Sequence, residues 1–359
     1  MRPHVKKLLW LCLCIALLGC THEVEKPSPE VQARVAHGKA LYLRMCAVCH
    51  GSEGQGYWAD QAPALAQPYF QASVTDEFLR TAITHGRTGS TMSAWGRERG
   101  GPLSPADIDA IIAFLHTWKH TPPARLNEAP LGGDVSKGQR VYEARCQTCH
   151  GRRGNGGPNV SVGNQELLST ASNSYLRFAI EHGRPGTVMP AFKDTLRKDE
   201  IEDVVALLRS WHVVRNPIAR RFQKPVRPPP LPLGPVPLNP KGPPPAGFKK
   251  FPDLTPLAVV KRELDRGARM ALLDARAPTD YTREHIAGAV SVPFYDPDPY
   301  VEKLPKDTWL VCYCSCPHAE SSSLARALQG KGFDKVTVLD EGLNVWHRKG
   351  YPIHTGEQP

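Results

Sequence analysis

The sequence predicts two all-α domains followed by an α/β domain with a mainly parallel sheet. Two helical segments repeat each other 100 residues apart, and a proline-dense run follows the second of them. In residues 255–354, short apolar runs alternate with helical patterns, which is typical of βα units and a parallel sheet. A chain of 359 residues, 22% charged and 41% hydrophobic, is long and apolar enough to form three separate cores.

The repeat predicts two equivalent domains, at residues 33–120 and 134–213. Each ends in a segment whose apolar residues recur at helical spacing along one face, so each domain closes with an amphipathic helix. The matching blocks are GKALYLRMCAVCHGSEGQG (38–56) with GQRVYEARCQTCHGRRGNG (138–156), FLRTAITHGRTGSTMSAW (78–95) with YLRFAIEHGRPGTVMPAF (175–192), and DIDAIIAFLHTW (107–118) with EIEDVVALLRSW (200–211).

Each repeat carries one C-x-x-C-H motif, the attachment signature of a covalent haem c. Two thiols three residues apart lie on one face of a helical turn, where each can bond a haem vinyl group, and the next histidine can ligate the iron. A redox dithiol or half of a zinc site has the same cysteine spacing, but two copies favour two haems. The residues are Cys46, Cys49 and His50 in the first repeat and Cys146, Cys149 and His150 in the second.

Two methionines are predicted to be the second axial ligands of the haem irons. Met92 and Met189 occupy equivalent positions of the repeat in a chain that has only five methionines. Methionine ligation raises the reduction potential relative to bis-histidine ligation. His85 and His182 also match between the repeats and are the competing ligands, although their H-G-R context is that of a helix end, where histidine interacts favourably with the dipole.

The repeated pattern closely resembles a class I cytochrome c domain. The resemblance implies that the first and last helices of each domain cross and that a loop methionine completes the coordination of the iron. The proximal histidine of a haem usually donates its other ring N–H to a nearby carbonyl. Pro63 and Pro158 are predicted to supply those carbonyls.

Residues 1–19 are predicted to be an export signal. Basic residues precede an apolar run at 8–18 that is too short to span a bilayer. The run ends in Leu17-Leu18-Gly19-Cys20, which resembles the lipobox of bacterial lipoprotein signals and implies acylation of Cys20. Ordinary secretion is the alternative. The expected location is therefore the periplasm, with a lipid anchor in a membrane, and the net charge of +10 is too mild to suggest nucleic-acid binding.

Residues 214–254 are predicted to be a proline-rich linker. The run RPPPLPLGPVPLNPKGPPP at 227–245 favours extended polyproline II, a semi-rigid spacer. A ligand for a proline-binding module is the alternative interpretation.

Three passages of the last domain resemble the rhodanese family: LLDARAPTDYTREHIAGAVSVPF (272–294), LVCYC (310–314) and LDEGLNVWHRKGYPI (339–353). The resemblance implies that Cys314, at a strand end before a helix N-terminus, accepts sulfane sulfur as a persulfide. Cys312 is expected to be buried and inert, while Cys316 either resolves a persulfide, pairs with Cys314 or is unused. Ala319 stands where the family has an arginine, so the loop lacks a cation for an anionic donor such as thiosulfate.

Three functions fit these features. The chain could be an enzyme in which Cys314 takes up sulfane sulfur while the haems carry away electrons. It could instead be an electron carrier whose rhodanese-like domain is a docking module, or that domain could bind copper(I) through Cys312, Cys314, Cys316 and His318. The expected partners are redox proteins of an exported electron-transfer chain and a sulfane-sulfur donor. Whether the chain is an enzyme stays open at this point.

Overall fold

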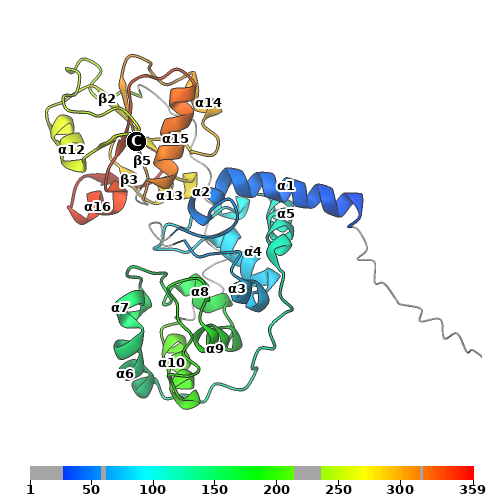
Figure 1. Ribbon diagram of the computed structural model, residues 1–359. Helices are drawn as coiled ribbons and strands as arrows, with labels where there is room; N and C mark the ends of the chain where they lie inside the picture. Colours follow the sequence, from blue (N-terminus) through cyan, green and yellow to red (C-terminus); the bar gives the residue numbers. More distant parts are fainter. Residues whose placement is uncertain (1–26, 58–61, 214–235, 316–317) are drawn as a thin grey trace, which may run out of the picture.

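The computed structural model describes residues 27–57, 62–213, 236–315 and 318–359. These residues form two helical units and one α/β unit, and the first helical unit lies between the other two (Figure 1). The predicted fold class is confirmed. The export signal, Cys20, Cys316 and the first part of the proline-rich run lie outside the described residues.

The two helical units have the same order of elements. In the first unit the helices are α1 (Pro29–Met45), α2 (Ala47–His50), α3 (Pro68–Ser73), α4 (Asp76–His85) and α5 (Pro105–Leu115). In the second they are α6 (Val135–Arg145), α7 (Gln147–His150), α8 (Gln165–Thr170), α9 (Asn173–His182) and α10 (Lys198–Ser210).

The first and last helices of each helical unit cross at a glycine. A Cβ atom at Gly38 of α1 would lie 1.9 Å from the carbonyl oxygen of Ala110 in α5, and one at Gly138 of α6 would lie 2.0 Å from that of Asp203 in α10. Only a residue without a side chain permits so close an approach of two backbones. The crossing that the cytochrome resemblance implies is therefore present in both units.

A buried arginine holds the segment between the two helical units. Arg177 of α9 is 1% exposed, forms an ion pair with Glu202 of α10, and donates hydrogen bonds to the carbonyls of Asn127 and Ala129. Breaking a buried pair by removing one partner typically costs about 3–5 kcal/mol, because the other charge stays buried without compensation. The connection between the units is thus a fixed part of the structure.

The α/β unit contains a five-stranded parallel sheet in the order β1-β6-β5-β2-β4. Its strands are β1 (Leu254–Thr255), β2 (Met270–Asp274), β4 (Val290–Ser291), β5 (Trp309–Tyr313) and β6 (Val336–Leu339). A separate antiparallel pair joins β3 (His285–Ile286) and β7 (Ile353–His354).

Helices cover both faces of this sheet because side chains alternate between the faces along each strand. One face packs on α12 (Leu257–Asp265) and α16 (Gly342–Arg348), and the other packs on α15 (Ala319–Gly330). Two short helices, α13 (Pro278–Arg283) and α14 (Asp298–Val301), lie in the connections after β2 and β4.

The second half of the predicted linker packs on the α/β unit. Leu238 pairs with Met270 of β2 through backbone hydrogen bonds, and the ring of Phe248 lies 5.6 Å from that of Trp309. Residues 236–254 thus extend the α/β unit at its N-terminal side rather than separating it from the rest of the chain.

The α/β unit docks on the first helical unit through the carboxyl edge of its sheet. The hydroxyl of Ser93 donates to the carboxylate of Asp280 in α13, and both side chains are buried. The ring of Trp95 packs 5.3 Å from that of Tyr295, which follows β4, and helix α2 contacts α15. The first helical unit therefore lies against the end of the sheet where loops follow the parallel strands.

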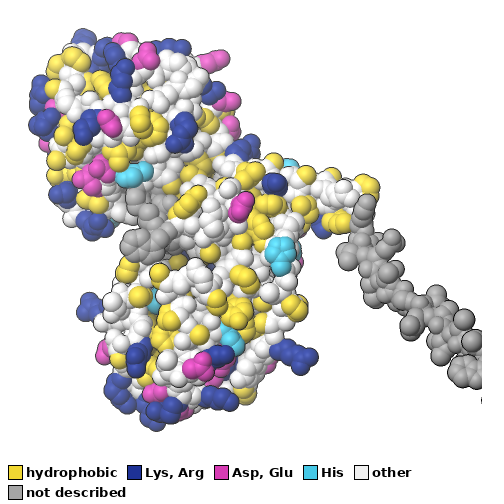
Figure 2. All heavy atoms as spheres, in the orientation of Figure 1, with side chains coloured by type: hydrophobic (Ala, Val, Ile, Leu, Met, Phe, Trp, Pro, Cys, Tyr) yellow, Lys and Arg dark blue, Asp and Glu magenta, His cyan; other side chains and the backbone are white. Residues whose placement is uncertain are grey.

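Basic and acidic side chains are spread over the visible face of the molecule, with several arginines and lysines on the outer parts of the second and third units (Figure 2). Among the described residues, no helix is both long and apolar enough to cross a membrane.

Candidate functional site

One helical turn brings each pair of motif cysteines together. Cys46 ends α1 and begins α2, and its carbonyl accepts hydrogen bonds from the backbone N–H groups of Cys49 (3.1 Å) and His50 (2.9 Å). The second unit repeats these distances from the carbonyl of Cys146. All four thiols are free of disulfide bonds.

The surroundings of the first thiol of each motif suit a thioether bond better than a zinc thiolate. Burial raises the pKa of Cys46 to about 12 and that of Cys146 to about 11. A zinc ligand must be deprotonated, and burial in apolar surroundings opposes that. A thioether carries no charge, so it gains from the same surroundings.

The two motif histidines are oriented by backbone carbonyls. His50 donates its Nδ1–H to the carbonyl of Pro63 at 3.0 Å, as predicted, and His150 donates to the carbonyl of Val160 at 2.9 Å. Burial lowers the pKa of both imidazoles, against a smaller opposing effect of those hydrogen bonds. Each ring is thus held neutral with Nε2 free to bind a metal.

The prediction that Pro158 supplies the second carbonyl is wrong. The N–H of Asn159 bonds the carbonyl of Cys149 at 3.1 Å, which turns the backbone so that the carbonyl of Val160 faces the ring. The loop between histidine and carbonyl is three residues shorter in this unit, so the nearest proline is not the equivalent position.

Met92 and Met189 end loops of the same construction. The backbone N–H of Arg87 donates to the carbonyl of Met92, and that of Arg184 donates to the carbonyl of Met189, both at 2.9 Å. Each loop is closed by this bond and presents its methionine at the same place in its unit. This equivalence supports their assignment as axial ligands.

The competing histidines have other partners. Nδ1 of His85 accepts a hydrogen bond of 2.8 Å from Arg99, and the ring of His182 packs against the rings of Phe178 (4.5 Å) and Tyr69 (5.8 Å). These contacts favour methionine as the second ligand in both units.

In each unit a tyrosine outside the predicted site residues stabilises the turn that follows the motif histidine. The hydroxyl of Tyr42 donates to the carbonyl of Gly51 at 2.7 Å, and that of Tyr142 donates to the carbonyl of Gly151 at 2.8 Å. These tyrosines could have been identified from the Gly-x-x-x-Tyr pattern that both repeats share. Each helical unit therefore contains two thiols, an imidazole and a thioether. These are the groups that attach a covalent haem and supply its histidine and methionine ligands.

The two helical units meet through equivalent surfaces. The side-chain amide of Gln67 donates to the carbonyl of Pro185 at 3.2 Å, and that of Asn164 donates to the carbonyl of Thr88 at 2.9 Å. Both pairs join positions that correspond in the repeat, since each partner is 97 residues from its counterpart. The interface thus has approximate two-fold symmetry. In each half, the methionine loop of one unit accepts a hydrogen bond from the residue that caps α3 or α8 of the other unit.

Cys314 directly follows β5 and is enclosed by protein. Its side chain is 1% exposed, its Sγ lies 3.3 Å from the hydroxyl of Ser321, and its carbonyl accepts from the N–H of Leu343 at 2.9 Å. Ser321 lies inside the first turn of α15, which begins at Ala319. The first turn of a helix favours an anion, so this position suits a reactive thiol.

Arg276 reaches the loop that follows Cys314, although sequence reasoning found no cation there. Its Nη1 donates to the hydroxyl of Ser315 at 3.2 Å, while its Nη2 pairs with the buried carboxylate of Asp274 at 2.6 Å. The sequence feature that could have identified this arginine is the Asp-Ala-Arg within LLDARAP. Because Asp274 compensates the charge, the loop still offers no free cation to a dianionic donor.

The described residues include no group of three or more histidine, cysteine, aspartate or glutamate side chains placed to hold a metal ion. Cys312 is buried within β5, and burial raises its pKa. The copper(I) hypothesis thus gains no support from the described part of the cysteine cluster.

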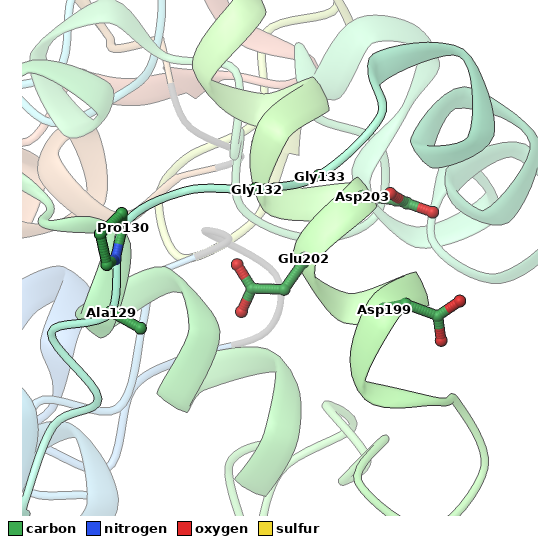
Figure 3. A pocket seen from close by; sticks show the side chains of 7 residues that line it. All are labelled: Ala129, Pro130, Gly132, Gly133, Asp199, Glu202 and Asp203. Atoms are coloured by element: carbon green, nitrogen blue, oxygen red, sulfur yellow. The ribbon is translucent and has the colours of Figure 1, made fainter.

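A shallow acidic hollow lies between α10 and residues 129–133 (Figure 3). Its carboxylates already have structural partners: Glu202 pairs with Arg177, and Asp203 accepts from the backbone N–H of Asp134 at 2.6 Å. The hollow is therefore part of the connection between the helical units.

The geometry defines two cytochrome c units and a rhodanese-like unit. A family model described as "Cytochrome C oxidase, cbb3-type, subunit III" matches residues 33–115 and 133–208, and one described as "Rhodanese-like domain" matches residues 257–349. The first two units are therefore cytochrome c domains, which implies two covalent haems c, and the third is a rhodanese-like domain.

Curated relatives resemble the helical part of the chain. A cbb3-type cytochrome c oxidase subunit FixP of Azorhizobium caulinodans is 29% identical over 188 residues, covering 50% of this chain and 60% of the relative. A cytochrome bc1 complex cytochrome c subunit of Corynebacterium efficiens is 28% identical, covering 52% of this chain and 66% of the relative. The chain thus spans less than two thirds of each.

Among solved structures, a rhodanese-like domain from Anabaena sp. is 27% identical and covers 29% of this chain and 80% of that domain, with a TM-score of 0.27.

We predict that Met92→Ala and Met189→Ala each remove the thioether ligand of one haem and leave the other haem unchanged. The near-infrared and magnetic circular dichroism spectra report this ligation, and the potential of the affected haem should fall. Met270→Leu, in the buried core of the α/β unit, is the matched control. Retention of both original spectra in the double variant would return the assignment to His85 or His182.

Proposed function

We propose that this chain is an exported, membrane-anchored di-haem electron carrier whose rhodanese-like domain accepts sulfane sulfur on Cys314. Bound haem supplies the redox chemistry, because its iron exchanges single electrons between Fe(III) and Fe(II). The observation that carries the proposal is the position of the first cytochrome unit, which contacts both the second cytochrome unit and the carboxyl edge of the rhodanese-like sheet.

The residues of the cytochrome pair support electron exchange within one chain. Gln67 bonds the loop that ends at Met189, and Asn164 bonds the loop that ends at Met92, so both methionine loops lie at one interface. Phe78 and Tyr175 add a ring contact of 5.2 Å across it. The curated relatives are named as subunits of a cytochrome oxidase and of a bc1 complex, which suggests redox partners in respiratory electron transfer.

We expect an electron injected into one haem by flash photoreduction to redistribute to the other within the same molecule. The rate of redistribution should not depend on protein concentration, because the route crosses a fixed interface. Time-resolved absorbance in the α-band measures it, with Met92→Ala as the variant that perturbs one site. Redistribution whose rate rises in proportion to concentration would instead mean exchange between separate molecules.

The surroundings of Cys314 support sulfur transfer. The thiol lies at the end of a central strand and beside the first turn of α15, where backbone N–H groups favour an anionic sulfur. Arg276, the arginine that reaches this loop among the described residues, is compensated by its ion pair with Asp274. We therefore infer that neutral or protein-bound sulfane donors serve it better than thiosulfate.

We predict that Cys314→Ser abolishes sulfur transfer from an organic persulfide to cyanide or to a thiol acceptor. Mass spectrometry of the wild-type full chain should find the added sulfur atom on Cys314, and mild reductant should be needed if Cys316 traps that thiol as a disulfide. Loss of transfer in Cys316→Ser alone would show that the nucleophile is misassigned. A wild-type chain that transfers no sulfur would leave the domain as a docking module, the role that the Ser93–Asp280 contact suggests.

Membrane attachment is proposed to depend on Cys20. We predict that Cys20→Ser either releases the protein from membranes or blocks its processing, while haem attachment survives because it depends on the two C-x-x-C-H motifs. Membrane fractionation with haem staining measures both properties at once. Unchanged association of the Cys20→Ser variant with membranes would contradict the anchor.

A further inference from the structure

The guanidinium of the half-buried Arg87 has one buried hydrogen-bond donor, its Nη1, that the described residues do not use. Its Nη1 is buried and has no hydrogen-bond partner among the residues that the structure describes. The group lies over the ring of Phe78, 5.2 Å from the ring centre, at the interface of the two cytochrome units. Burial lowers the pKa of Arg87, and Tyr175 and Glu166 of the second unit only partly oppose this.

A buried donor of this kind calls for an anion, because an unpaired charge inside a protein is costly. The backbone of Arg87 is bonded to that of Met92 at 2.9 Å, so the arginine begins the loop that ends at the proposed iron ligand. Haem carries two propionate carboxylates at one edge. A guanidinium matches a carboxylate with two parallel hydrogen bonds.

We propose that Arg87 binds a propionate of the haem of the first cytochrome unit and raises the reduction potential of that haem. The inference rests on the haem assignment but concerns a residue outside the attachment and axial sites. A positive charge that neutralises the propionate destabilises Fe(III) relative to Fe(II), since the oxidised haem carries one more positive charge.

The equivalent arginine of the second unit is engaged differently. Arg184 donates through Nη2 to the hydroxyl of Tyr175 at 3.3 Å and through Nη1 to the carbonyl of Gly183 at 3.0 Å. Phe78 occupies the position of Tyr175 in the first unit and has no hydroxyl, so Arg87 lacks that partner. The two haems are therefore inequivalent, and the first depends more strongly on its arginine.

Glu166 is the competing partner for Arg87. Its Oε2 is buried and, within the described residues, also has no hydrogen-bond partner. An ion pair between Arg87 and Glu166 would join the two units without involving haem. If Arg87 acts as a charge beside the propionate, removing it lowers the haem potential, whereas removing the negative charge of Glu166 does not. If Arg87 acts only through an ion pair with Glu166, removing either partner has the same effect.

The test is a potentiometric titration of the full chain with both haems attached, each haem being assigned from the spectra of Met92→Ala and Met189→Ala. Arg87→Gln should lower the Fe(II)/Fe(III) ratio of the first haem about tenfold at a fixed potential, which is ~59 mV for one electron. Arg87→Lys should recover part of the shift, and Arg184→Gln, the matched control, should move the second haem less.

A second readout does not depend on the size of the shift. In redox-difference infrared spectra with haem labelled at its carboxylate carbons, the propionate band should move in Arg87→Gln and in Arg87→Lys. An unchanged band and unchanged potentials in Arg87→Gln would overturn the proposal. So would a shift confined to the second haem, or a fall of the same size in Glu166→Gln. If Arg87→Gln does not assemble, an unmoved propionate band in Arg87→Lys overturns it.

Discussion

No side chain fits where the first and last helices of each cytochrome unit cross, because a Cβ atom at Gly38 would lie 1.9 Å from the carbonyl oxygen of Ala110. The close crossing fixes where α1 ends, and with it the turn that carries the motif cysteines. One helical turn beyond the glycine, Tyr42 packs its ring 5.3 Å from that of Trp118 and donates to the carbonyl of Gly51. The position of His50 thus depends on a backbone contact made twelve residues earlier in the chain, at Gly38.

The repeat duplicates this construction but not every side chain around it. In the paired amide contacts of the interface, the first unit contributes Gln67 and the second contributes Asn164 at the equivalent position. The ring contact across the interface likewise joins two equivalent positions, Phe78 of the first unit and Tyr175 of the second. The amides keep the same role because each also caps the helix that follows it, α8 or α3. The exchange of Phe for Tyr changes a role, since only Tyr175 gives its neighbouring arginine a hydroxyl partner. Approximate symmetry therefore sets the interface, and its departures make the two halves chemically different.

Much of the fold and of the haem sites could be predicted because the information is local. The motif spacing, the matched methionines and strand β5 at Trp309–Tyr313 each depend on a few neighbouring residues. The carbonyl of Val160 could not be predicted, because it depends on how a loop of different length turns back to Cys149. The buried Nη1 atom of Arg87 and the contact of Ser93 with Asp280 could not be predicted either, because each requires two units to be placed against each other in space.

The order of the units in space differs from their order in the chain. The second cytochrome unit precedes the rhodanese-like unit in sequence, yet the first cytochrome unit lies between them (Figure 1). Gln67 of the first unit bonds the carbonyl of Pro185 in the second, while Ser93 of the first unit bonds Asp280 in the third. The first cytochrome unit therefore keeps both neighbours at once, through residues on different parts of its surface.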